Sequence, residues 1–130
     1  MTAGPVGFHH VQIAMPAGEE ERAEAFYHGL LGLPLVQKPP ELRGRGGCWF
    51  RGGGVELHLG VEERFAPAAK AHPALLVEGW DDLRARLREA GAAVVDDDLR
   101  IDGHRRFYAF DPFGNRLELI ESESAPTPGR

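Results

Sequence analysis

The sequence predicts an α+β domain made of two similar halves. The same order of patterns (strand, helix, short strand, hairpin) runs through residues 8 to 60 and again through residues 72 to 121. Neither half is long enough to close a core alone, so the two are expected to share one. We predict a single domain over residues 1 to 130, with a linker at 61 to 71 and a frayed tail at 122 to 130.

Length and composition limit the class of protein. A chain of 130 residues with 42% hydrophobic residues is expected to be one globular domain. Its net charge of −5, without a basic run, argues against a nucleic-acid partner. No apolar run approaches the roughly 20 residues that span a bilayer, so no membrane partner is expected. Cys48 is the only cysteine, which excludes an internal disulfide, fits a cytoplasmic location and predicts a small buried side chain.

The first half opens with an alternating strand over residues 8 to 15, in which His10 and Gln12 share one face. A helix is predicted over residues 19 to 31, because its first turn is acidic and its apolar residues recur at helical spacing, with Gly32 as its C-cap. The remaining predicted elements of this half are a short strand at 35 to 38, a loop at 39 to 47 and a hairpin of strands 47 to 51 and 54 to 60, joined by a glycine turn.

The second half repeats these patterns after a connector that is expected to be partly helical. Gly91 is the predicted C-cap of its helix. The predicted elements are a strand at 72 to 77, a helix at 80 to 90, a strand at 92 to 95, an acidic loop at 96 to 103 and a closing hairpin at 106 to 121.

The closing hairpin contains the first chemical signal. Its turn, residues 111 to 115, has Pro112 and Gly114, whose backbone preferences favour a tight reversal. The second strand then places Glu118 among Leu117, Leu119 and Ile120. A carboxylate in an apolar strand is costly to bury unless it is paired or binds a cation.

Partners for Glu118 are found at equivalent positions of the two halves. His10 lies on the first strand of the first half and His72 opens the first strand of the second, while Glu56 and Glu118 lie on the two last strands. Two imidazoles and two carboxylates can therefore converge by pseudo-symmetry. Such a mixed set suits a divalent ion of Zn, Ni, Co, Mn or Fe.

Structural roles for the same residues stay open. Glu56 can face solvent, Glu118 can pair with an arginine, and a single histidine in a strand is usually structural. His58 shares a face with Glu56, so it is a candidate acid or base as well as a structural residue. Four large aromatic residues are expected in the core: Phe26, Tyr27, Trp80 and Phe107.

Three motifs give the chain a family resemblance: residues 9 to 13 (HHVQI), residues 25 to 33 (AFYHGLLGL) and residues 110 to 118 (FDPFGNRLE). With them the chain resembles the vicinal oxygen chelate superfamily, which includes glyoxalases, bleomycin resistance proteins and dioxygenases. The resemblance implies two βαβββ modules that form a cup-shaped mixed sheet, and a homodimer that builds each site from modules of both chains. It also implies metal ligands at His10, His72 and Glu118, with Glu56 as the fourth ligand of the glyoxalase branch.

The function implied by this resemblance is that of a metal-dependent lyase or isomerase of the glyoxalase type. Its small substrate would chelate the ion through two neighbouring oxygens, and Glu118, or alternatively Glu56, would move a proton. Tyr108 matches an active-site tyrosine of the fosfomycin-resistance branch, but the serine-containing loop of that branch is absent. Two alternatives are a non-haem Fe(II) dioxygenase that uses His10, His72 and Glu118, and a protein that only binds a small molecule or antibiotic. The candidates for holding a substrate carboxylate are Arg43, Arg45, Arg105 and Arg106.

Overall fold

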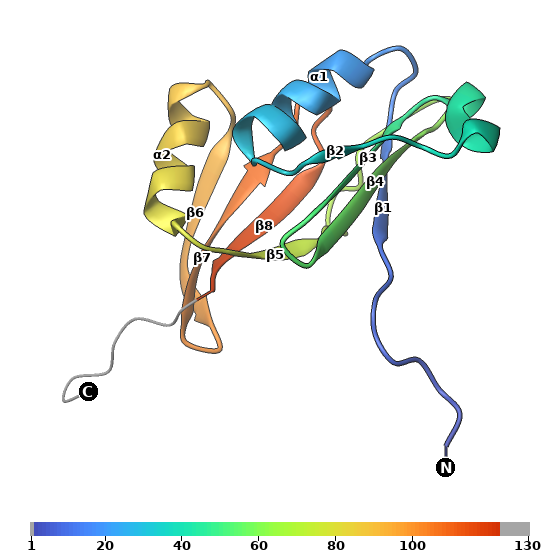
Figure 1. The fold of residues 1–130 in the computed structure, drawn as a ribbon. Coiled ribbons are helices and arrows are strands. Elements are labelled where there is room, and N and C mark those ends of the chain that lie inside the picture. Colours follow the sequence, from blue (N-terminus) through green and yellow to red (C-terminus); the bar gives the residue numbers. More distant parts are fainter. Residues whose placement is uncertain (1, 123–130) are drawn as a thin grey trace.

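The computed structural model describes residues 2–122 and contains two four-stranded mixed sheets, one from each half of the chain (Figure 1). In both sheets the first strand pairs in parallel with the last strand, and the remaining pairs are antiparallel. This arrangement confirms the predicted α+β class. The first sheet has the order β1 (Val11–Met15), β4 (Val55–Val61), β3 (Cys48–Gly52), β2 (Leu35–Val36), and the second has the order β5 (Ala74–Val77), β8 (Arg116–Glu121), β7 (His104–Phe110), β6 (Val94–Ile101).

Each half has one main helix, and the two helices approach each other (Figure 1). Helix α1 (Glu20–Glu24) continues as a π-helical segment (Ala25–Leu30), and α2 spans Trp80–Glu89. Both predicted C-cap glycines have the positive φ that this role requires, 76° at Gly32 and 84° at Gly91. A 3-10 helix (Pro40–Arg45) occupies part of the first predicted loop. Within residues 2–122, no helix has the length and apolar character needed to cross a bilayer.

The two halves share a single hydrophobic core, as the repeat predicts. Its members come from both sheets and both helices, and the four aromatic residues expected there are buried. Cys48 is buried as well, and burial raises the pKa of its thiol to about 12. The fully buried side chains of this core include Met15, Tyr27, Phe50, Leu57, Leu87, Phe107 and Leu119.

The prediction of an acidic loop at residues 96 to 103 was wrong. Strand β6 runs on to Ile101 and turns into β7 through Asp102 and Gly103, with an irregular register between Asp97 and Ile101. Arginines pair with two of the three aspartates of this strand: two nitrogens of Arg84 lie 2.7 and 2.5 Å from the Asp96 carboxylate, and Arg106 Nη2 lies 2.9 Å from Asp97 Oδ2. Because these partners come from distant positions in the sequence, local composition suggested a loop.

Smaller differences affect the first strand of each half. β1 begins at Val11 rather than residue 8, and β5 begins at Ala74 rather than residue 72. His10 and His72 therefore lie just before their strands. The connector at residues 62 to 73 contains no helix, contrary to expectation. Of the predicted tail, residues 123–130 lie outside the described part of the chain.

Candidate metal centre

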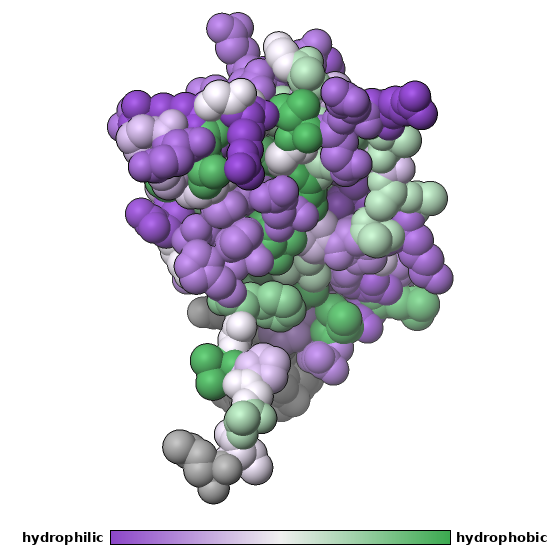
Figure 2. Space-filling model, turned by 90° about the vertical axis from the view of Figure 1, so that its right-hand side faces the viewer, coloured by the Kyte–Doolittle hydropathy of each residue, from purple (hydrophilic) through white to green (hydrophobic). Residues whose placement is uncertain are grey.

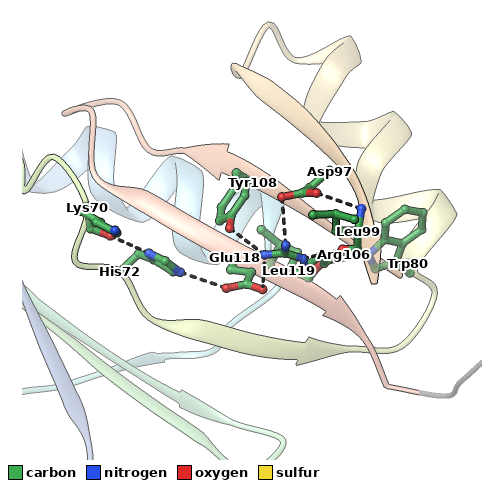
Figure 3. Close-up of polar contacts among 9 residues, drawn as sticks. All are labelled: Lys70, His72, Trp80, Asp97, Leu99, Arg106, Tyr108, Glu118 and Leu119. Carbon is green, nitrogen blue, oxygen red and sulfur yellow. Dashed lines mark hydrogen bonds and ion pairs between the residues drawn. The ribbon is translucent and has the colours of Figure 1, made fainter. Parts of the chain in front are cut away.

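His72 and Glu118 form a direct pair in the second half (Figure 3). His72 Nε2 lies 2.9 Å from Glu118 Oε1, and His72 Nδ1 lies 2.7 Å from the carbonyl oxygen of Lys70. Glu118 is buried, with 5% of its surface exposed, as the apolar strand around it predicts. The pair arises because Ala74 and Glu118 are in register where β5 pairs with β8, which places the residues preceding β5 beside the carboxylate.

Arg106 and Tyr108 complete the surroundings of Glu118. Arg106 Nη1 lies 3.2 Å from Glu118 Oε2 and donates to the Tyr108 hydroxyl at 2.7 Å (Figure 3). Tyr108 is in register with Glu118 across β7 and β8, and its ring meets that of His72 edge-on at 5.5 Å. The arginine partner that sequence reasoning left open for Glu118 therefore exists alongside the histidine partner.

The equivalent site of the first half contains a stack of three rings. His58 lies between Trp49, at a centroid distance of 4.0 Å, and His10, at 4.1 Å, with nearly parallel planes. His58 is only 4% exposed, and its Nε2 lies 3.0 Å from Glu56 Oε2. His10 and Glu56 are therefore held close together by the same buried imidazole.

The charges in this stack follow from burial and hydrogen bonding. Burial lowers the pKa of His58, with the Glu56 hydrogen bond opposing the shift, so the imidazole tends to stay neutral. The hydrogen bond from His58, with a further contribution from the nearby Arg51, lowers the pKa of Glu56, which therefore stays ionised. The geometry thus supplies a carboxylate that accepts a hydrogen bond from a neutral imidazole.

A polar network fixes the turn that precedes β8. The Tyr27 hydroxyl donates to Asp111 Oδ2 at 2.7 Å, and Asp111 Oδ1 accepts from the backbone N–H groups of Phe113 and Asn115. The Asn115 side chain also donates to the carbonyl oxygen of Ala14 in β1 at 2.8 Å. The turn that precedes Glu118 is thereby hydrogen-bonded to a helical segment and to a strand of the first half.

The four predicted ligands do not gather at one point within a single chain. Within residues 2–122, the His, Cys, Asp and Glu side chains form one group of three whose ligand atoms all lie within 4.8 Å of one another: His9, His10 and Glu56. His72 and Glu118 form a separate pair. A cavity of about 880 Å³ nevertheless runs between the halves, and its lining includes His10, Glu56 and His72.

The comparisons with known proteins agree with this architecture. The family model for the Glyoxalase/Bleomycin resistance protein/Dioxygenase superfamily matches residues 7–119. The chain belongs to this superfamily. A glyoxalase family protein from Bacillus anthracis is 46% identical to it, with a TM-score of 0.88 over 95% of this chain and 100% of that one.

Two further solved structures share the fold at lower identity. The lactoylglutathione lyase from Agrobacterium tumefaciens is 24% identical, with a TM-score of 0.65 over 91% of this chain and 96% of that one. The fosfomycin resistance protein FosX from Listeria monocytogenes is 15% identical, with a TM-score of 0.72 over 92% and 96%. At these identities the likeness shows the fold alone. No curated protein matches the chain.

Two residues beside the candidate site, His9 and Arg116, are not among those predicted from the sequence. In the predicted strand over residues 8 to 15, His9 would face away from His10, but β1 starts only at Val11, and His9 Nδ1 lies 2.9 Å from His10 Nδ1. Arg116 was not considered, although it lies two residues before Glu118 and lines the cavity. Its position could have been found, because residues i and i+2 of a strand share a face. Of the arginines proposed as substrate ligands, Arg105 and Arg106 are paired with carboxylates.

Proposed function

We propose that the protein is a metal-dependent lyase or isomerase of the glyoxalase type, acting on a small substrate with two neighbouring oxygens. One observation carries the metal requirement: both ring nitrogens of His72 face oxygen acceptors. A neutral imidazole carries a single N–H. The hydrogen bond to the Lys70 carbonyl assigns that proton to Nδ1, so the Nε2 to Oε1 contact calls for a second proton or a cation between the two atoms.

The donor set fits a borderline divalent ion. His10, Glu56, His72 and Glu118 would hold Zn, Ni, Co, Mn or Fe(II) with two nitrogen and two oxygen ligands. Hydrogen bonds already orient three of these side chains: His58 supports Glu56, Lys70 supports His72, and Arg106 supports Glu118. When bound, such an ion supplies Lewis acidity toward a chelating substrate.

We further propose a homodimer in which each centre takes His10 and Glu56 from one chain and His72 and Glu118 from its partner. The two pairs are separate within one chain. Strands β1 and β5, which lie beside these pairs, are sheet edges, and apolar side chains remain exposed near them, with Phe8 at 95% and Leu76 at 67%. On the face of Figure 2, hydrophobic residues run between hydrophilic ones toward the extended N-terminal segment.

In this proposal a carboxylate moves the proton. Glu118 is buried, with Arg106 on Oε2, so Oε1 is the atom available on the His72 side. Removal of a proton next to a substrate carbonyl and its return to the adjacent carbon needs one such group within hydrogen-bonding reach. Glu56 is the second candidate, with Oε2 occupied by His58. Tyr108 and Arg106 border the same region and favour negative charge there.

The experiment is an assay of the purified protein, loaded in turn with Zn, Ni, Co, Mn or Fe(II), against methylglyoxal and a thiol. We expect thioester formation with at least one ion and its loss in Glu118→Gln. If protein shown to bind these ions forms no product with any of them, the proposed glyoxalase activity is ruled out. Oxygen uptake with a catechol under Fe(II) would instead favour dioxygenase chemistry.

A further inference from the structure

Arg116 differs from the other arginines around the candidate metal centre because it has no acidic partner. Within residues 2–122, it forms no ion pair, and its Nε is buried without a hydrogen-bond partner. A buried polar group without a partner is rare in native proteins and calls for an explanation. Four other arginines of the second half have acidic partners: Arg84 and Arg88 pair with Asp96, Arg105 with Asp81 and Glu121, and Arg106 with Asp97 and Glu118.

Two aromatic rings hold the guanidinium of Arg116 in place. Its central carbon lies 5.2 Å from the centroid of Tyr108 and 5.8 Å from that of Phe110. A cation–π contact does not use the N–H donors of a guanidinium, which lie in its plane and suit a planar acceptor. Arg116 is also the single arginine among the described residues that line the 880 Å³ cavity, which it shares with His72. An arginine fixed on aromatic rings beside a cavity is suited to bidentate recognition of an oxyanion.

We propose that Arg116 binds the anionic group, a carboxylate or a phosphoryl group, of the substrate. Arg116 and Glu118 are neighbours on one face of β8, so their relation is independent of how the two chains pair. Two residues along a strand span roughly 7 Å. The substrate is therefore compact, with its anionic group roughly that distance from the end that reaches Glu118. This inference deepens the proposed function and rests on it for the chelating end of the substrate.

The test uses metal-free full-length protein, so that its outcome is independent of metal chemistry. Acetate and methylphosphonate are titrated separately while the Arg116 Nε–H cross-peak and the Tyr108 ring resonances are followed by NMR. We expect a saturable shift of both signals, and the tighter anion identifies the carboxylate or the phosphoryl class. In Arg116→Gln, the anion concentration that half-saturates the Tyr108 shift should rise at least about tenfold, because a charged hydrogen bond is lost.

The matched control is Arg100→Gln, which removes an exposed arginine that donates only to the Gly103 carbonyl. It should bind both anions like the wild type. Absence of a saturable shift at the Arg116 cross-peak of the wild type would overturn the proposal without any variant. Equal binding by Arg116→Gln and the wild type would overturn it as well. Zinc binding, measured separately on the same protein, tests the proposed metal site independently of the anion titration.

Discussion

His72 places one ring nitrogen 2.9 Å from Glu118 Oε1 and the other 2.7 Å from the carbonyl oxygen of Lys70. The backbone contact fixes the ring in one orientation, so the nitrogen that faces the carboxylate is Nε2. Histidine ligands of protein-bound metals commonly have this type of support on their second nitrogen. The arrangement therefore explains how a residue just outside β5 can be oriented without belonging to the strand.

Glu118→Gln should weaken zinc binding at least about tenfold, because it replaces an ionised ligand with a neutral amide. Isothermal titration of the metal-free protein measures this directly. Glu121→Gln is the matched control: it changes an acid of the same strand that pairs with Arg105 outside the candidate centre. Equal losses in the two variants would argue for a general effect of charge rather than ligation.

Tyr27→Phe should lower the free energy of unfolding by about 1–3 kcal/mol, since it leaves the buried Asp111 carboxylate without one of its donors. Denaturant unfolding measures the change. Tyr108→Phe is the control, because Tyr108 is only half-buried and its hydroxyl contacts Arg106. A loss in Tyr108→Phe as large as in Tyr27→Phe would contradict the structural role given to the Asp111 network.

The stability of the fold should fall as the pH drops below the ordinary pKa of histidine, near 6.5. Burial lowers the pKa of His58, so the unfolded chain takes up the proton before the folded chain does. The contribution of His58 is therefore fully present above that pH and is lost progressively down to its folded pKa. Denaturant unfolding at pH 7.5 and pH 5 measures the slope. His58→Gln should have a shallower slope, and an unchanged slope would show that other groups are responsible.

A shared centre predicts that two inactive variants rescue each other. The first carries His10→Ala and Glu56→Ala, and the second carries His72→Ala and Glu118→Ala. In a heterodimer of the two, one centre combines the intact halves of both chains. Random mixing then restores about one quarter of the wild-type zinc sites, because half of the dimers are mixed and half of their centres are intact. A mixture that binds no more zinc than its components would place each site within one chain.

Much of the fold was predictable because local patterns determine it. Helix α2, which is followed by Gly91, and the hairpin that contains Asp111 have both periodicity and turn residues to mark them. The run of three aspartates in strand β6 is typical of a loop, and the arginines that pair with two of them, Asp96 and Asp97, lie elsewhere in the sequence. Ion pairs between residues far apart in the sequence have no local signal.

The candidate site was predictable to a lesser degree. Pseudo-symmetry and an apolar strand around a carboxylate pointed to Glu118, and its partner His72 is found beside it. The stacking of His58 between Trp49 and His10 depends on the register of β3 and β4, which no local pattern gives. His9, His10 and Glu56 come together within the first half of the chain. This grouping depends on where β1 starts, which the alternating pattern of residues does not show.

The most direct test of the central claim is a zinc titration of His72→Ala beside His9→Ala. If His10, Glu56, His72 and Glu118 hold the ion together, the wild type and His9→Ala bind one ion per chain, and His72→Ala loses it. If the ion is instead held by His9, His10 and Glu56 within the first half, His72→Ala keeps its zinc and His9→Ala loses it. That second result would contradict the account.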